Sequence, residues 1–326
     1  MPKEIILGST PHDPRGVFAG DVQQVSHTIL RHYAGWVVNV TQTTDRTVID
    51  ALNGSGVYLT KADPKRLLVP DSIENDHLHL LSQTAERARN LGLRRIQYTD
   101  GDRIIVAAKY FPKDFRQMAI LASYVADSRS YLNLRRSPTD LRRHPVPLIQ
   151  TEIQFYLLYN RAFGMPIDIG STAHVMSLDV AQEIIGVSPK MESVSFPHPK
   201  WLIIAKKMGT EIQSVETHNV LTFETPEQFR KEIEKEIGSG HDYSFIQQAY
   251  MRIIDPKRTF SSEEWKLRFE TERQYLTLLQ NHIHELGLDD QTKGDLTDEA
   301  EELLVGLKRL RRIVLETFEL DGKETK

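Results

Sequence analysis

The 326-residue sequence predicts an α/β protein with a mostly parallel β-sheet flanked by helices, followed by an all-helical extension. Short apolar runs that are typical of buried strands alternate with amphipathic helical segments over the first two-thirds of the chain. The composition changes at Glu224-Thr225-Pro226, and only helical patterns follow. Because strands that alternate with helices form parallel sheets covered on both faces, we expect an α/β domain at residues 1–225 and a helical extension at 226–326.

The first four strands are expected at short apolar runs that have helices between them. The strands are 5–7, 36–40, 56–59 and 96–98, and the helices are 22–33, 46–52 and 73–91. In the third helix, Leu80, Leu81 and Ala85 fall on one face, and Gly92 is typical of a helix C-terminus. In such a sheet, a ligand binds at the carboxyl ends of the strands.

The pattern continues less regularly beyond residue 103. Helices are expected at 114–126, 148–163, 179–185 and 201–208, and strands at 131–134, 174–176, 212–215 and 220–223. The polar and basic residues 135–147 are typical of a loop. The extension is expected to hold helices at 226–237, 242–254, 261–286 and 295–318, the third of which begins at a good capping residue, Ser261.

The composition is that of a soluble globular protein and excludes several classes of function. Hydrophobic residues make up 40% and charged residues 26% of the chain, and no apolar run is long enough to span a bilayer. Without cysteine there is no disulfide, thiol nucleophile or cysteine-ligated zinc, which fits a cytoplasmic protein. The net charge of −4 argues against general nucleic-acid binding.

The strongest candidate for chemistry is the acidic motif Asp100-Gly101-Asp102, directly after the fourth expected strand. Mg²⁺ and Mn²⁺ prefer carboxylate oxygens and keep positions open for phosphate oxygens. Gly101 would let the backbone approach a diphosphate closely. The alternative is a hairpin, because Asp-Gly between apolar runs is a strong turn signal and residues 96–98 could pair with 104–106. The three strand–helix units upstream favour the metal–diphosphate interpretation.

With this motif, residues 1–225 resemble the nucleotide-diphospho-sugar glycosyltransferases of the GT-A fold, which is Rossmann-like. The metal motif of that family, Asp-any-Asp (DXD), also follows the fourth strand. The resemblance implies transfer of a sugar from a nucleoside-diphosphate sugar to an acceptor that the sequence does not identify. It also implies that Asp102 and Asp100 hold Mn²⁺ or Mg²⁺ and that Asp100 contributes to nucleotide binding.

Further segments occupy positions at which that family binds its substrates. Thr10 and Pro11 follow the first expected strand, and residues 41–45, which end in Asp45, follow the second. The resemblance implies that these residues hold the nucleoside. The run 168–175 resembles the acceptor-side segment of the family.

The catalytic base is missing from the position at which the resemblance places it. Inverting members usually carry an acidic pair after the acceptor-side segment, but residues 195–201 contain no carboxylate. The base then lies elsewhere, or the mechanism is retaining, or the protein is not an active transferase. Glu152 and Asp168 are candidates for the base, although Glu152 could simply complement a helix dipole. His198 is a candidate third metal ligand, although a histidine between two prolines is also typical of a rigid loop.

Four arginines form a basic cluster shortly after the acidic motif: Arg135, Arg136, Arg142 and Arg143. Guanidinium groups bind phosphate oxygens in a bidentate geometry. We expect these side chains to close over the diphosphate or to hold a phosphorylated acceptor, from a segment that is mobile without ligand. The alternative is a solvated, charged loop.

Two other functions stay open at this point. A non-catalytic α/β scaffold would use Asp-Gly as a hairpin turn and its helices for association. A sugar nucleotidyltransferase would need a glycine-rich first loop with Lys or Arg, and residues 8–16 do not have that pattern. The last helix carries an apolar stripe from Leu303 to Val314, which predicts packing on its own domain, with a homo-oligomer contact or a membrane surface as the alternatives.

Overall fold

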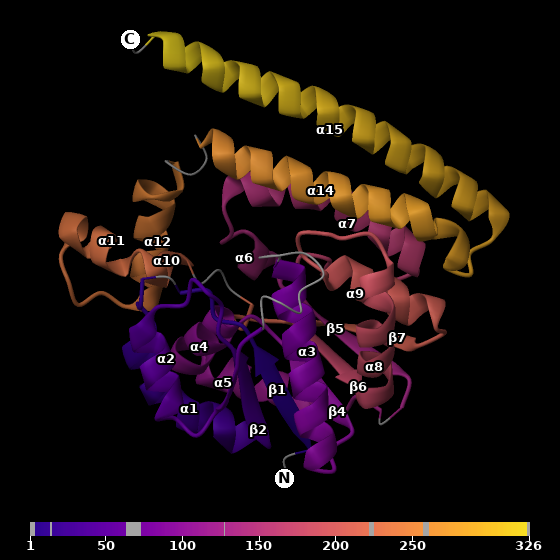
Figure 1. Ribbon diagram of the computed structural model, residues 1–326. Coiled ribbons are helices and arrows are strands. Elements are labelled where there is room, and N and C mark those ends of the chain that lie inside the picture. The colour runs from indigo at the N-terminus through magenta and orange to yellow at the C-terminus, as the bar shows by residue number, and fades with distance from the viewer. Residues whose placement is uncertain are drawn as a thin grey trace.

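The computed structural model describes residues 4–13, 15–62, 73–126, 128–221, 225–256 and 261–324. Its strands are β1 (Ile5–Ser9), β2 (Gly35–Asn39), β3 (Tyr58–Thr60), β4 (Arg95–Tyr98), β5 (Ser130–Arg136), β6 (His174–Ser177) and β7 (Glu211–Thr217). They form one seven-stranded sheet in the order β3-β2-β1-β4-β6-β5-β7 (Figure 1). β6 is antiparallel to β4 and β5, and all other pairs are parallel, which confirms the mostly parallel sheet predicted from the sequence.

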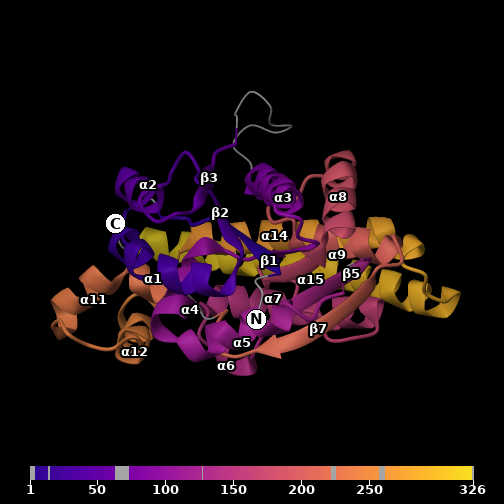
Figure 2. The same cartoon turned by 90° about the horizontal axis from the view of Figure 1, so that it is seen from below.

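Helices cover both faces of this sheet. They are α1 (Ala19–His32), α2 (Arg46–Asn53), α3 (Ile73–Asn90), α4 (Gly101–Tyr110), α5 (Pro112–Ala122), α6 (Pro138–Leu141), α7 (Val146–Phe163), α8 (Leu178–Val187) and α9 (His198–Lys207), with a 3-10 helix η2 at Ser188–Lys190. α1, α4 and α5 lie on one face, and α3, α8 and α9 lie on the other (Figure 2). Successive residues of β1 point to opposite faces, so Ile5 and Leu7 join one hydrophobic core and Ile6 the other.

The structure corrects three expectations about local structure. The hairpin alternative for the acidic motif is wrong, because residues 104–106 belong to α4 and not to a strand. The predicted loop 135–147 is wrong in part, because it begins in β5 and includes α6 and the start of α7. The strand predicted at 220–223 is wrong for Val220 and Leu221, which lie in a bend, and its other two residues lie outside the described residues.

The chain from residue 225 onward forms helices and no strand within its described residues. These are α10 (Thr225–Gln228), α11 (Arg230–Ile237), α12 (Tyr243–Ile253), α14 (Ser262–His282), the 3-10 helix η3 (Ile283–Glu285) and α15 (Asp290–Glu324). α14 packs against α7 and α9, and α15 packs against α14 and α7. Phe269 and Leu276 of α14 are buried in the same core as Ile6 of β1, so this core is continuous with that of the sheet.

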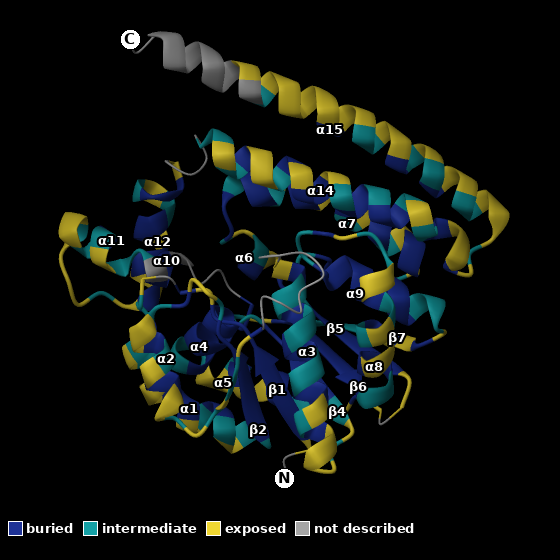
Figure 3. Cartoon of the chain, viewed as in Figure 1, coloured by how far each residue is buried: buried dark blue, intermediate teal, exposed yellow. Residues whose placement is uncertain are grey.

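The surface of α15 is largely exposed on the side away from α14 (Figure 3). Of its expected apolar stripe, Leu307 is buried, Leu303 and Val314 pack partly against the core, and Leu310 is 36% exposed. The stripe therefore packs mainly on its own chain, as expected. Within the described part of the chain, no helix is long and apolar enough to cross a membrane.

Candidate functional site

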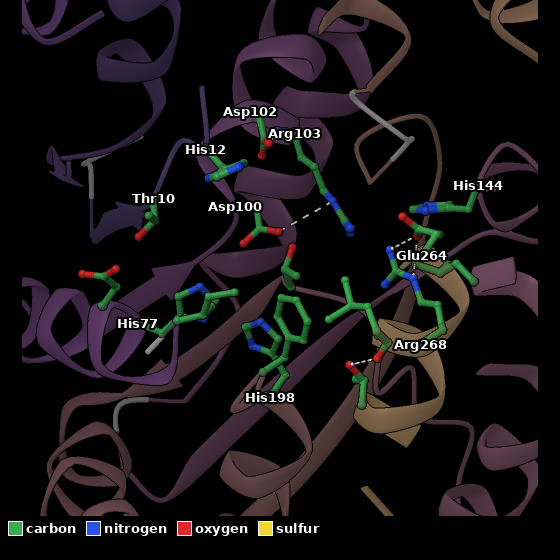
Figure 4. A pocket seen from close by; sticks show the side chains of 18 of the residues that line it. Thr10, His12, His77, Asp100, Asp102, Arg103, His144, His198, Glu264 and Arg268 are labelled. Carbon is green, nitrogen blue, oxygen red and sulfur yellow. Dashed lines mark hydrogen bonds and ion pairs between the residues drawn. The ribbon is translucent and has the colours of Figure 1, made fainter. Parts of the chain in front are cut away.

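A cavity of about 560 Å³ lies at the carboxyl ends of the parallel strands. Thr10 follows β1, Thr41 follows β2 and Asp100 follows β4, and all three line it. α14 lines the opposite side, where Glu264 and Arg268 face Asp100 across the cavity (Figure 4). The cavity therefore lies at the edge of the sheet where ligands bind in α/β proteins, and a helix of the C-terminal region covers it.

The acidic motif lies at the start of α4 and borders this cavity. Asp100 is the N-cap residue of α4, and Asp102 lies in its first turn. The backbone N–H of Gly101 donates a hydrogen bond to the carbonyl of Thr10 at 3.1 Å. A Cβ at Gly101 would lie 2.7 Å from the backbone nitrogen of Pro11. Glycine is thus needed here because the chain itself approaches closely, and this contact holds the end of β1 beside the two carboxylates.

The three predicted metal ligands all line the cavity, but they do not form a ready-made three-ligand site. In the described part of the chain, no group of three His, Asp or Glu side chains is placed to hold a metal ion. Neither ring nitrogen of His198 has a hydrogen-bond partner among the described residues, and its ring packs against other aromatic rings. Asp100 and Asp102 alone suit a Mg²⁺ or Mn²⁺ ion that completes its coordination with water and phosphate oxygens.

Arg103 is a cavity residue that the sequence reasoning missed. Its side chain extends into the cavity toward His144 (Figure 4), and its Nε lies 3.9 Å from Oδ2 of Asp100. A guanidinium group in this position can bind phosphate oxygens that approach the two carboxylates with a cation. Its place directly after the acidic motif, in the first turn of a helix, is a signal that could have identified it.

The predicted nucleoside-binding residues have different environments. Thr10 lines the cavity beside the acidic motif. Asp45 is the N-cap residue of α2, where its Oδ1 accepts a hydrogen bond from the backbone N–H of Thr47 at 2.8 Å. Among the described residues that line the cavity, Asp45 is absent. The structure thus brings Thr10 into the site and gives Asp45 a capping role.

Asp168 and Glu152, the two candidates for the base, are joined by one buried guanidinium group. The Arg136 side chain is 1% exposed, and its Nη2 lies 2.7 Å from Glu152 Oε2 and 2.8 Å from Asp168 Oδ1. Asp168 also accepts hydrogen bonds from the backbone N–H groups of Arg136 and Gly170. Burial alone would raise the pKa of Asp168, but the charge and hydrogen bonds of Arg136 lower it below the usual value. Glu152 lines the cavity, whereas Asp168 does not appear among its described lining residues.

The other arginines of the basic cluster also have partners outside the cavity. Arg135 lies 3.9 Å from a carboxylate oxygen of Glu216. Arg142 donates to the carbonyl of Pro138, and Arg143 donates to the side chain of Asn219. Of the four predicted phosphate-binding arginines, none is among the described residues that line the cavity. The structure does not bring this cluster to the acidic motif.

Three histidines from different elements pack together at one side of the cavity, and two of them, His77 and His198, line it. His77 of α3, His174 of β6 and His198 of α9 are buried, and the ring centroid of His198 lies 5.3 Å from that of His77 and 5.0 Å from that of His174. Burial lowers the pKa of His77 and of His174 to about 3. Burial and the two neighbouring imidazoles lower the pKa of His198 as well. The three rings are therefore neutral at physiological pH.

This histidine cluster predicts loss of stability in acid. In the unfolded chain a histidine binds its proton near pH 6.5, whereas His77 and His174 in the folded protein do so only near pH 3. The free energy of unfolding should therefore fall as the pH drops from about 6.5 toward 3, by up to about 1.4 kcal/mol per pH unit for each histidine. In the variant His174→Leu, the free energy of unfolding, measured with urea, should decrease less between pH 7 and pH 5 than in the wild type. The matched control is His27→Leu on the exposed side of α1, and an equal slope in both variants would contradict the prediction.

No protein-family model matches the chain, and no curated protein matches its sequence. Among solved structures, the chain is similar to glucosyl-3-phosphoglycerate synthase from Mycobacterium tuberculosis. The complex of that protein with uridine-diphosphate gives a TM-score of 0.46 at 12% identity, over 89% of this chain and 82% of that chain. Its complex with Mn²⁺, uridine-diphosphate and glucosyl-3-phosphoglycerate gives 0.43 at 10% identity, over 67% and 71%. Both TM-scores are below 0.5, so this likeness assigns neither an activity nor functional residues.

Proposed function

We propose that the chain is a metal-dependent glycosyltransferase that transfers a sugar from a nucleoside-diphosphate donor to an acceptor. The observation that supports this most is the position of Asp100, Asp102 and Arg103, which lie at the start of α4 and line a cavity at the carboxyl ends of the strands. The volume of about 560 Å³ is within the usual range for small-molecule sites. The hairpin on which the scaffold alternative depended is absent, because α4 begins at Gly101.

The cavity has residues that suit both the diphosphate and the nucleoside of such a donor. Asp100 and Asp102 would hold Mg²⁺ or Mn²⁺, which neutralises the diphosphate as the bond to the sugar breaks. Arg103 and the N-terminal end of α4 would add positive charge toward the same phosphate oxygens. Thr10 and Thr41, at the ends of β1 and β2, would face the nucleoside, in agreement with their place in the cavity.

The reaction in this arrangement is a substitution at the anomeric carbon of the sugar. The bond between that carbon and the diphosphate oxygen breaks, a bond to the acceptor hydroxyl oxygen forms, and the acceptor hydroxyl loses its proton. The diphosphate leaves with its charge held at the start of α4. Glu152 lines the same cavity and stays the candidate for the proton acceptor.

A calorimetric titration tests this function directly. We expect at least one of UDP, GDP, ADP, CDP and dTDP to bind the full chain in the presence of Mn²⁺ and to bind much more weakly with EDTA. The reason is that Asp100 and Asp102 repel a diphosphate unless a cation lies between them. If none of the five nucleotides binds with Mn²⁺ or Mg²⁺, the proposed function is wrong.

A further inference from the structure

The cavity extends from the acidic motif into a space between α7 and α14. We call this part the α14 chamber, lined by Leu148, Glu152, Arg268, Thr271, Glu272 and Tyr275. α7 and α14 pack directly against each other, and the hydroxyl of Tyr159 donates a hydrogen bond to the carbonyl of Tyr275 at 2.9 Å. The chamber is therefore bounded by two helices that are held together by core contacts.

Both guanidinium groups beside the α14 chamber already have carboxylate partners. Nη2 of Arg268 lies 2.8 Å from Oε1 of Glu264, one turn earlier on α14. Arg136 bonds Glu152 and Asp168. An anionic group that entered the chamber would have to compete with these carboxylates for positive charge. The guanidinium groups of Arg268 and Arg136 therefore offer little free positive charge to a phosphate or carboxylate in this part of the cavity.

Glu272 is the unusual side chain of the α14 chamber. The residue is 1% exposed, and its Oε2 has no hydrogen-bond partner among the described residues. Burial and the nearby charge of Glu152 raise the pKa of Glu272 well above the usual value, although Arg268 and Arg136 act in the opposite direction. Burial therefore favours the protonated form of this carboxyl group, and that form offers one hydrogen-bond donor together with acceptor oxygens.

A buried polar atom without a protein partner is costly unless water or a ligand supplies the missing hydrogen bond. A hydroxyl group can do so, because it both donates and accepts and carries no charge. Leu148 and Tyr275 add apolar surface to the lining of the same cavity, as is usual in sites for small ligands. The chamber thus combines apolar sides with one buried carboxyl group whose Oε2 has no hydrogen-bond partner among the described residues.

We propose that the α14 chamber is the acceptor subsite, that it takes an uncharged polyhydroxy acceptor such as a sugar or polyol, and that Glu272 binds an acceptor hydroxyl group. This inference rests on the proposed glycosyltransferase function and replaces the expectation of a phosphorylated acceptor. It also makes α14 part of the site, although the helix lies beyond the boundary at which the sequence places the end of the α/β domain.

The first test compares acceptors with the unmodified full chain. Release of nucleoside diphosphate from the donor is measured with glucose, mannose, glycerol and myo-inositol as neutral probes, and with 3-phosphoglycerate and glucose 6-phosphate as anionic probes. We expect stimulation by at least one neutral probe and none by the anionic probes. Stimulation by an anionic probe alone, or by none of the six, overturns the inference and leaves the proposed function intact as long as the diphosphate still binds with Mn²⁺. Failure of diphosphate binding overturns both.

The second test uses variants of Glu272. Glu272→Gln keeps a neutral donor and acceptor, so its KM for the neutral acceptor should stay within about twofold of the wild-type value. Glu272→Leu removes the hydrogen bond and should raise that KM by about tenfold. The Kd for the nucleoside diphosphate with Mn²⁺ should not change in either variant. The matched control is Glu270→Leu on the exposed side of the same helix.

Two outcomes of the variant test contradict a role in acceptor binding. One is an unchanged acceptor KM in Glu272→Leu, and the other is an equal rise in KM in the Glu270→Leu control. A change in kcat and in diphosphate affinity without a change in acceptor KM would show a structural role only, and would also overturn the inference. If Glu272→Leu does not fold, Glu272→Gln and the comparison of acceptors still decide the question.

Discussion

Replacement of Arg136 by methionine is expected to destabilise the protein by about 3–5 kcal/mol. The side chain is 1% exposed and binds both Glu152 and Asp168, so its loss leaves two buried carboxylates without a countercharge. Chemical unfolding followed by circular dichroism at pH 7 measures the effect. The control is Arg142→Met, because Arg142 is exposed and its loss should change the free energy of unfolding by less than about 0.5 kcal/mol.

The pH dependence of the same variant gives an independent check. Because the pKa of Asp168 is lowered in the folded protein, its stabilising effect is present above about pH 3.9 and disappears as the pH falls through the lower, folded value. The difference in the free energy of unfolding between wild type and Arg136→Met should therefore become smaller in strong acid. If Arg136→Met lowers the free energy of unfolding by less than about 1 kcal/mol at pH 7, the ion pairs of Arg136 stabilise the protein little beyond the cost of burying the charges.

Replacement of Asp102 by asparagine is expected to weaken Mn²⁺-dependent binding of a nucleoside diphosphate by at least about 100-fold. Asp102 supplies one of the two carboxylates at the start of α4, and an amide oxygen is a poorer ligand because it carries no charge. Calorimetry with and without Mn²⁺ measures the effect, and the melting temperature checks that the fold is retained.

The matched control for this variant is Asp298→Asn on the exposed surface of α15. This variant removes one carboxylate charge, as Asp102→Asn does, but at a residue far from Asp102 in the sequence. It should bind the nucleotide with the affinity of the wild type. Equal affinity of Asp102→Asn and wild type would refute the assignment of the acidic motif to the metal. Weaker binding that is the same with Mn²⁺ and with EDTA would instead indicate that Asp102 contacts the nucleotide without a cation.

The alternation of strands and helices was enough to predict the parallel part of the sheet. The antiparallel direction of β6 was not predictable, because the short strand-like segment 174–177 has a pattern that is the same for either direction. The acidic motif was found because its residues are neighbours in the sequence. Their local setting was uncertain, since Asp-Gly fits both a hairpin and the start of a helix.

The basic cluster shows why composition alone misplaced part of the site. Arginine side chains usually lie at the surface, and the sequence around Arg136 gives no sign that this one is buried. Its partners Glu152 and Asp168 lie 16 and 32 residues further along the chain. No local pattern reveals such partners. The same holds for Arg268 and Glu272, whose helix reaches the cavity through its packing on α7 and α9.

The long sequence separation between the two sides of the cavity has a consequence for how the protein is made. Thr10 stands near the beginning of the chain and Glu272 far toward its end, yet both line one cavity. The strands of the sheet are synthesised before α14, and chains generally fold from the N-terminus during synthesis. Until α14 is in place, the acidic motif lacks the helix that lines the opposite side of the cavity. The cavity is therefore complete only once this late helix has packed on α7 and α9.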